Sequence, residues 1–415
     1  MSAVWWAYRL AAPLLGSIAP AAGAFVPSRE RPYWRERLGA VRRPGGCHAW
    51  VHAASLGESA GAPALLRELR ARQADARFWL TATSLAGRER LARLDPHCSL
   101  APLDSPQAVR RFVAGVQPRR LFLLETELWP HWLLRARLEQ LPVAVVSARL
   151  SERSVRRYRA LGPGMRGLIG TLAAVLCQSD EDAARWLSAG APEERTRVVG
   201  NLKSDGLPTP AGDRAVVRAE LGLDPARPLL VLGSLRPGEA RALARAWSAQ
   251  SVATRARWQV VAVPRHPRAS DELRAEAASN GVTVDARESA GGSWRWDDRV
   301  GVLTGWYRAA DAAFVGGSLS PFGGHNPLEP AACGVAVLMG PHHASQATYV
   351  RALEAAGALL VAAAGEPLAA ALRGLLEHDA ARAERGRAGL AVAQAQRGAA
   401  SAVVKLLGEW NLWPA

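Results

Sequence analysis

The sequence predicts an α/β protein with two doubly wound, Rossmann-like domains. Three observations lead to this prediction. Apolar strand-like segments alternate with helix-like segments along most of the chain, a polar stretch rich in glycine and proline interrupts them near residue 206, and polar clusters follow the predicted strands. At 415 residues the chain is long enough for two domains that each bury a core.

In the first half of the chain, five predicted strands each precede a predicted helix. The strands are HAWVHAAS, ARFWLTATS, RLFLLET, VAVVSA and AAVLCQS, and the helices span about 60–73, 86–94, 129–138, 152–161 and 180–188. This alternation is typical of parallel strands joined by crossover helices.

A second round of strands and helices follows GLPTPAGD, the predicted linker at 206–213. Its strands are PLLVLGS, WQVVAVP, GVTVD, AAFVGG and VAVLMG, and its helices span about 239–250, 270–280, a short segment from 327, 349–356 and 367–378. We therefore predict an N-terminal membrane anchor at 1–45, a first domain at 46–205 and a second domain at 206–415. A ligand cleft is expected between the two domains.

The stretch 314–343 combines a strand, a glycine-rich loop, a short helix and a second strand. Asn326 is a suitable N-cap, Pro327 fits the first helical position, and Glu329 can reach back to free N–H groups. A helix that begins after a glycine-rich loop favours anions, so a phosphate is the expected ligand. The alternative is a plain strand-to-helix turn in which Glu329 is only a cap. The sequence has neither a P-loop nor a clean G-x-G-x-x-G motif at a helix start.

Residues 3–26 are apolar apart from Arg9 and a few small polar residues, and they are about long enough to cross a bilayer. Arg9 and two prolines interrupt the stretch. A basic cluster follows, which suits anionic lipid, and its members are Arg29, Arg31, Arg35, Arg37, Arg42 and Arg43. The alternative is an amphipathic helix that packs on the protein's own core.

The formal charge of +15 and the pI near 10.9 indicate an anionic partner. No nucleic-acid-binding signature occurs, so we expect no nucleic acid partner. The cysteines lie far apart without paired spacing, which favours reduced thiols in a cytoplasmic setting and no metal cluster: Cys47, Cys98, Cys177 and Cys333.

Polar clusters follow seven predicted strands, at the strand ends where open α/β sheets bind ligands. They are SLGES at 55–59, TATSLAGRE at 81–89, ETELWP at 125–130, SARLSERS at 147–154, GNLKSD at 200–205, PRHP at 264–267 and GGHNPLEP at 323–330. In this order they make the chain resemble the 3-deoxy-D-manno-octulosonic acid (Kdo) transferases of lipopolysaccharide biosynthesis. The likeness extends from the N-terminal anchor to beyond GPHH at 340–343.

The resemblance implies an inverting, metal-independent GT-B glycosyltransferase with no cofactor. The enzyme would lie on the cytoplasmic face of the inner membrane, beside anionic lipid, and move Kdo from CMP-Kdo to a lipid A precursor (lipid IVA). Glu58 matches the family's proposed base, and a carboxylate in a glycine-containing loop can take the proton of the acceptor hydroxyl. Without the other motifs, Glu58 would be read as a helix-start residue.

The resemblance also assigns the remaining site residues. The family's CMP contacts match Pro264, Arg265, Gly301, Val302, Leu303, Asn326, Pro327, Leu328 and Glu329. Arg265 would pair with the phosphate and Glu329 would accept from the ribose hydroxyls. Further substrate candidates are Ser55, Glu125, Glu127, Arg149, Lys203, His266 and His325. Two alternatives remain, namely a structural Glu–Arg pair and histidines that are only hydrogen-bonded loop residues.

Three positions depart from the family pattern. The family commonly has Asn at Ser147, a STHEGE-like segment where SLRPGE occupies 234–239, and Glu at Val302. These changes put donor or acceptor detail in doubt. Two rival functions are a GT-B transferase that uses another nucleotide sugar on a membrane lipid, and a catalytically idle module that binds the membrane surface.

Overall fold

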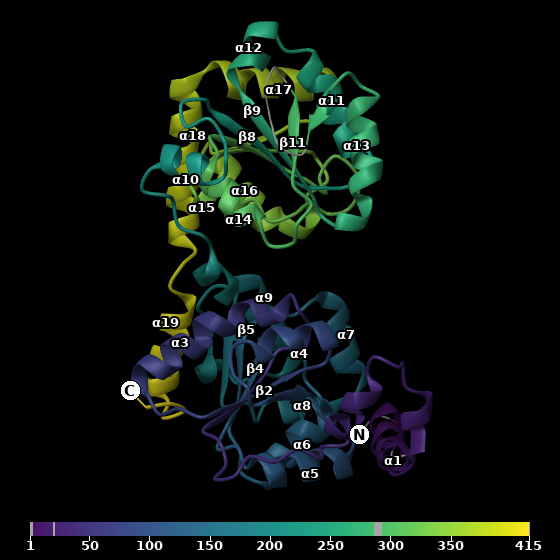
Figure 1. The fold of residues 1–415 in the computed structure, drawn as a ribbon. Helices are drawn as coiled ribbons and strands as arrows, with labels where there is room; N and C mark the ends of the chain where they lie inside the picture. Colours follow the sequence, from purple (N-terminus) through teal and green to yellow (C-terminus); the bar gives the residue numbers. More distant parts are fainter. Residues whose placement is uncertain (1–2, 20, 286–292, 415) are drawn as a thin grey trace. The chain divides into compact units, whose positions relative to one another are not determined.

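The structure is a computed structural model that describes residues 3–19, 21–285 and 293–414. The chain forms two compact units, one of Met1–Gly206 with Gln396–Ala415 and one of Leu207–Ala395 (Figure 1). Each unit contains a seven-stranded sheet, and every strand pairing in both sheets is parallel within the described residues. The prediction of two doubly wound α/β domains is confirmed.

The first sheet has the order β3-β2-β1-β4-β5-β6-β7. Because β1 pairs with both β2 and β4, the strand order reverses between β1 and β4. Ligands bind at such a switch point, outside the carboxyl ends of the strands. The strands are β1 (Ala49–His52), β2 (Phe78–Ala82), β3 (Cys98–Leu100), β4 (Leu121–Leu124), β5 (Val143–Ala148), β6 (Ala174–Cys177) and β7 (Thr196–Val198).

Helices cover both faces of the first sheet. One core cluster is shared by α5 (Pro106–Val116), α6 (Pro130–Leu138), α7 (Glu152–Ala160), α8 (Pro163–Ile169) and α9 (Asp180–Ala189). The cluster on the other face includes side chains of α3 (Ala62–Arg72), α4 (Leu85–Ala92) and α19 (Ala399–Glu409). The sequence prediction missed α5, α8, β3 and α19.

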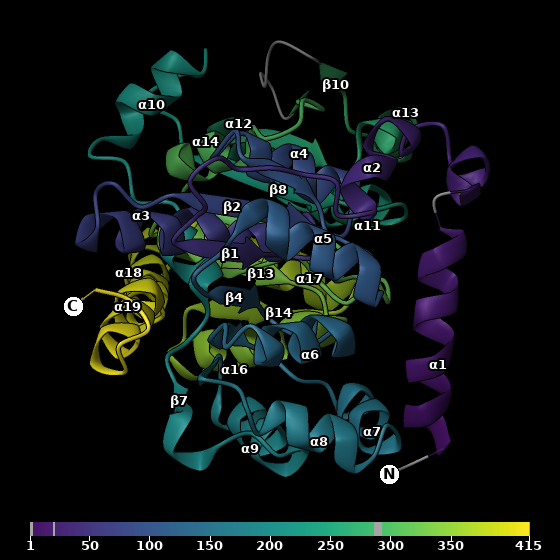
Figure 2. The ribbon, with the colours of Figure 1, turned by 90° about the horizontal axis from the view of Figure 1, so that it is seen from below.

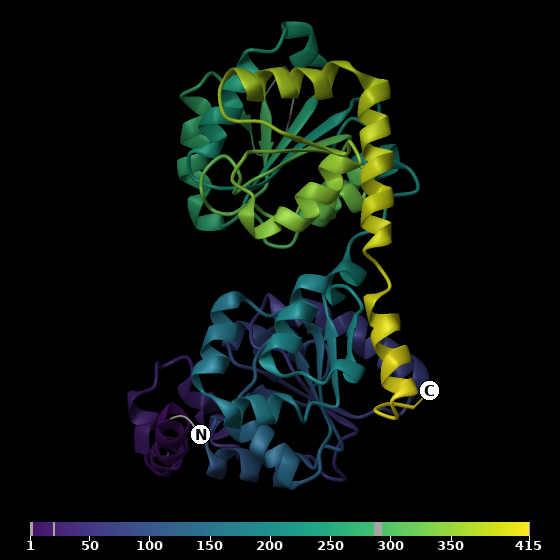
Figure 3. The same cartoon turned by 180° about the vertical axis from the view of Figure 1, so that it is seen from behind.

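The C-terminal residues belong to the first unit, whereas we predicted that the second domain runs to 415. Figure 3 shows the yellow C-terminal helix among the elements of the first unit. Trp413 Nε1 donates to the Leu69 carbonyl at 3.1 Å, and the ring of Trp413 stacks on Phe78. Asp205 accepts from the N–H groups of Gly398 and Ala400, which fixes the start of α19. The apolar face of α19 completes a core that the first half of the chain leaves open.

The second sheet has the order β10-β11-β9-β8-β12-β13-β14, with its switch point between β8 and β12. The strands are β8 (Leu229–Leu235), β9 (Gln259–Pro264), β10 (Val284–Asp285), β11 (Trp294–Trp296), β12 (Ala312–Val315), β13 (Ala336–Met339) and β14 (Leu359–Val361). One face packs on α11 (Glu239–Ser248), α13 (Ser270–Ala278) and α17 (Glu366–Glu377). The other face packs on α10 (Arg214–Glu220), α14 (Leu303–Ala309), α15 (Leu328–Ala332), α16 (Ala347–Ala355) and α18 (Asp379–Ala395). Helix α12 (Val252–Arg257) follows α11 in the chain.

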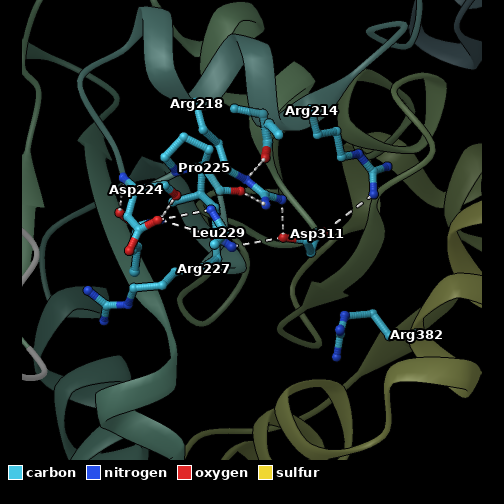
Figure 4. A network of polar contacts seen from close by, with 12 residues as sticks. Arg214, Arg218, Asp224, Pro225, Arg227, Leu229, Asp311 and Arg382 are labelled. Atoms are coloured by element: carbon cyan, nitrogen blue, oxygen red, sulfur yellow. Dashed lines mark hydrogen bonds and ion pairs between the residues drawn. The ribbon is translucent and has the colours of Figure 1, made fainter.

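An ion-pair network around Asp311 joins the amino ends of β8 and β12, at the edge opposite the predicted ligand site (Figure 4). Asp311 Oδ2 accepts from Arg218 and from the Leu229 N–H, the latter at 2.8 Å, and Arg214 Nη1 lies 3.5 Å from Asp311 Oδ1. Arg214 also donates to the Gly334 carbonyl at 2.6 Å. The network ties α10 to the sheet and to the turn before β13, which is a structural role.

Helix α1 (Ala3–Ile18) lies along one side of the first unit (Figure 2). Trp5 is buried in the core cluster that includes α5 and α6. Its ring packs against Gly164 so closely that a Cβ atom at position 164 would clash with it. The opposite face of α1 is exposed and apolar, with Trp6, Leu10, Leu14 and Ile18 spaced four residues apart. Across 3–19, 21–285 and 293–414, the structure contains no helix with the length and apolar character needed to cross a membrane.

The basic cluster after α1 is partly turned inward. Arg37, in α2 (Trp34–Arg37), donates to the Ala101 and Thr83 carbonyls, and Arg43 is buried. Four of the six predicted arginines remain exposed: Arg29, Arg31, Arg35 and Arg42. The charge available to a lipid surface is therefore smaller than the sequence suggested.

Candidate functional site

Glu58 lies after β1, at the start of a short 3₁₀ helix, η3 (Glu58–Gly61). Its backbone N–H donates to Ser55 Oγ at 3.2 Å, and Glu58 Oε2 accepts from the Ala54 N–H at 2.8 Å. Burial, together with neighbouring carboxylates, raises the pKa of the Glu58 carboxyl to about 7. Such a carboxyl is partly ionised at neutral pH and can accept a proton there.

Glu127 is one of those carboxylates, and three side chains hold its Oε2 atom. Thr83 Oγ1 donates to it at 2.8 Å and Trp129 Nε1 at 3.2 Å, while His52 Nε2 lies 3.1 Å away. Burial alone would raise the pKa of Glu127, but the hydrogen bonds lower it overall. Glu127 is therefore held as a carboxylate.

Glu125 is the other neighbouring carboxylate, and it forms an ion pair with Lys203. Lys203 lies in η5 (Leu202–Gly206), where the Leu202 N–H donates to Ser147 Oγ at 3.2 Å. The structure thus brings the predicted residues Ser55, Glu58, Glu125, Glu127 and Lys203 to the switch-point edge of the first sheet.

Arg149 does not complete a buried Glu–Arg pair, which was one alternative from the sequence. Its side chain is exposed, and it forms no ion pair with any residue that the structure describes. Lys203 occupies the role that the alternative gave to Arg149, because it neutralises Glu125.

Strand ends at both candidate sites carry strained backbone. Ser147 near the end of β5 has φ 53°, Ser234 near the end of β8 has φ 56°, and Glu125 after β4 has φ 66°. At Ser147 and Ser234 the strand pairing shifts by one residue. Left-handed backbone at residues other than glycine is costly and concentrates at functional sites.

In the second unit, a cavity of about 80 Å³ brings together five of the predicted donor residues. They are Pro264, Arg265, Gly301, Val302 and Leu303, which come from the end of β9 and the start of α14. Ser234, in the departing segment SLRPGE, also lines this cavity. The departure therefore lies directly beside the candidate donor contacts.

The short helix after the glycine-rich loop begins one residue later than predicted. α15 starts at Leu328, Pro327 is the N-cap, and Asn326 Oδ1 accepts from the Leu328 N–H at 3.0 Å. Burial raises the pKa of Glu329, whereas Arg265 and Asn326 lower it, and the net change is upward. Arg265 therefore acts electrostatically on Glu329, although Glu329 does not line the cavity described above.

The two candidate histidines lie on loops of the same unit. His266 precedes η6 (Pro267–Ala269) and is half-buried. Burial lowers the pKa of His325 to about 4, with further lowering from Arg265 and Arg236, so this imidazole is neutral at pH 7. His325 can therefore offer a phosphate an N–H group but no charge.

Glu239 shapes the glycine-rich loop, a role that the sequence reasoning missed. Its side chain is fully buried, and its two oxygens accept from four backbone N–H groups at 2.8–2.9 Å, those of Arg236, Gly317, Ser318 and Leu319. The only available signal was an acidic residue in the segment SLRPGE after a strand. His52, at the last position of β1, was missed in the same way.

Two parallel-sheet domains, each with polar residues at its switch point, define a GT-B-type fold. A putative UDP-N-acetylglucosamine 2-epimerase from Listeria monocytogenes has the same architecture, with a TM-score of 0.58 at 13% identity over 89% of this chain and 98% of that one. This likeness concerns the fold alone.

Sequence comparisons identify the family within this class. Residues 32–206 match the family model described as 3-Deoxy-D-manno-octulosonic-acid transferase (kdotransferase). The 3-deoxy-D-manno-octulosonic acid transferase of Bordetella pertussis is 37% identical over 87% of either chain, and that of Haemophilus influenzae is 30% identical over 92% of either chain. The chain belongs to the 3-deoxy-D-manno-octulosonic acid transferase family and is a glycosyltransferase.

Proposed function

We propose that the chain transfers Kdo from CMP-Kdo to a lipid A precursor, with inversion at the anomeric carbon and without a metal or cofactor. Family membership supports the donor and the transferred sugar. The observation that carries the mechanism is Glu58, whose half-buried carboxyl lies after β1 beside Glu125 and Glu127 and has its pKa raised to about 7.

Glu58 acts as the base in this mechanism. The acceptor hydroxyl oxygen attacks the anomeric carbon of Kdo, its proton moves to the Glu58 carboxylate, and the bond to the CMP phosphate breaks on the opposite face of the sugar. The electron pair of that bond leaves with CMP. The reaction requires the donor and the acceptor to meet. The cleft between the two domains, where they would meet, stays a prediction.

The second unit binds CMP in this proposal. Arg265 lines the cavity with the start of α14 and can make a charge-assisted bond to the phosphate, while Glu329 accepts from the ribose. Fixed donors of this kind can stabilise the departing phosphate without a metal ion.

Helix α1 holds the enzyme at the membrane in this proposal. Its exposed face carries Leu10 at 66%, Leu14 at 70% and Ile18 at 62% exposure, and Phe25 follows at 91%. An amphipathic helix of this kind lies in the interface, and nearby arginines attract anionic lipid. The expected location is the cytoplasmic face of the inner membrane, where a lipid acceptor would be within reach.

The experiment is to compare Glu58→Gln with the unaltered chain for CMP-Kdo turnover and for CMP binding. Glutamine keeps the shape and the bond from the Ala54 N–H but cannot take a proton. Turnover should fall roughly 10²- to 10⁴-fold while CMP still binds. A fully active variant would refute the assignment of the base.

A further inference from the structure

A buried chain of hydrogen bonds leads from the core of the first unit to Glu127. Trp50 Nε1 donates to Thr81 Oγ1 at 2.7 Å, Thr81 Oγ1 lies 2.9 Å from His52 Nδ1, and His52 Nε2 lies 3.1 Å from Glu127 Oε2. The side chains of Thr81 and His52 are completely buried.

The donors and acceptors along this chain determine which ring nitrogen of His52 carries the proton. An ionised Glu127 can only accept, so His52 Nε2 donates to it. Thr81 Oγ1 accepts from Trp50 and keeps both a hydroxyl hydrogen and a second lone pair, so it can complete the contact with His52 Nδ1. The contact with Glu127 therefore assigns a hydrogen to His52 Nε2.

The hydrogen bonds to the Glu127 side chain all reach a single oxygen. His52, Thr83 and Trp129 contact Oε2, whereas Oε1 has no hydrogen-bond partner among residues 3–19, 21–285 and 293–414. The Glu127 side chain is 28% exposed, so solvent or a ligand can reach it. A carboxylate with one oxygen fixed by rigid donors and the other open is suited to accept from a hydroxyl group.

We propose that His52 is a positioning residue that fixes Glu127, so that Glu127 Oε1 binds a hydroxyl group of the acceptor sugar beside the Glu58 base. The inference rests on the proposed function, because it takes the acceptor to be a sugar. Holding a second hydroxyl would orient the acceptor for attack, since a fixed geometry lowers the entropic part of the barrier.

Other charged groups act on the two carboxylates. Glu125 and Lys203 face Glu58, and Arg37 and Tyr158 interact electrostatically with Glu127. The negative charge of Glu127 raises the pKa of Glu58. Glu127→Gln should therefore move the acid limb of the kcat/KM profile to lower pH, because Glu58 would lose its proton more easily.

The test compares His52→Leu with His52→Gln, whose Nε2 amide can replace the donor of the imidazole. We expect His52→Leu to raise the acceptor KM at least about tenfold, since hydrogen bonds to charged groups have this magnitude. The KM for CMP-Kdo should stay unchanged, and His52→Gln should restore most of the acceptor affinity. An acceptor KM that is the same in both variants, whether raised or normal, would overturn the proposal.

A measurement that needs no turnover separates this inference from the proposed function. In ¹⁵N NMR spectra of the unaltered chain, the His52 ring should show hydrogen on Nε2 at neutral pH. If Nε2 carries hydrogen but CMP-Kdo is not turned over, the proposed function fails and the hydrogen-bond chain stands. An Nε2 atom without hydrogen would overturn the positioning role.

Discussion

Glu239→Gln should loosen the glycine-rich loop of the second unit, because Glu239 is the acceptor for four backbone N–H groups. A glutamine oxygen can accept from two of the four, and its NH₂ group then faces the other two. Each buried donor without an acceptor costs roughly 1–3 kcal/mol, so the variant should lose about 2–6 kcal/mol of local stability.

Glu276→Gln is the matched control in the same unit. Glu276 accepts from only two backbone N–H groups, those of Gly238 at 2.7 Å and Arg241 at 3.2 Å. The same reasoning leaves one donor without an acceptor, so the cost should be roughly 1–3 kcal/mol. The two variants differ in the number of N–H groups and not in the chemistry of the substitution.

Amide hydrogen exchange of a peptide covering 314–325 measures this loss in the second unit alone. Exchange in Glu239→Gln should be at least about tenfold faster than in the unaltered chain. Exchange in Glu276→Gln should change less in this peptide, because the Glu276 carboxylate accepts from N–H groups at the start of α11 and not from those of the loop. Equal exchange in Glu239→Gln and the unaltered chain would refute the role of Glu239 in holding the loop.

Three further predictions concern the donor site, the base and α1. Arg265→Ala and Glu329→Ala should each weaken CMP binding in calorimetry roughly tenfold or more, through loss of a phosphate bond and a ribose acceptor; unchanged affinity in both would remove the donor-site assignment. The pKa of Glu58 is about 7 in the folded chain and about 4.5 in the unfolded chain, so the folded state binds this proton more tightly. The free energy of unfolding therefore falls as the pH rises from 4.5 to 7. Glu58→Gln should therefore be more stable than the unaltered chain by about 1–2 kcal/mol at pH 8, a value reduced for its partial exposure, with no gain at pH 4 in denaturant unfolding. Leu10→Glu with Leu14→Glu should reduce sedimentation with anionic vesicles, and equal sedimentation would argue against α1 as the membrane contact.

The sequence predicted the parts of the fold that depend on local patterns. Strands such as VAVVSA are continuously apolar because helices cover both faces of a parallel sheet. The regular alternation of such strands with helix-like segments is visible in the sequence. Helix α19 and the residues after it could not be assigned to the first unit in this way, since Trp413 docks against Leu69 and Phe78 through contacts more than 300 residues apart in sequence. The short edge strands β3 and β14 were missed for lack of length.

For the candidate site, too, the sequence predicted what depends on local motifs and not what depends on contacts distant in sequence. Motifs placed Glu58, Arg265 and Glu329 at strand ends, and the structure groups them with the neighbours expected from the switch points. The sequence could not show that Lys203 rather than Arg149 pairs with Glu125. It also could not identify Glu239, because its partners are backbone N–H groups of a loop 78–80 residues away.

The most direct test of the proposed activity is mass analysis of a lipid A precursor after incubation with the full-length chain and CMP-Kdo, without added metal and with excess chelator. The account predicts a product heavier than the acceptor by whole Kdo residues, with release of CMP. It also predicts no product from a panel of other nucleotide sugars. An unmodified acceptor with CMP-Kdo, or a product formed from another nucleotide sugar instead, would contradict the account.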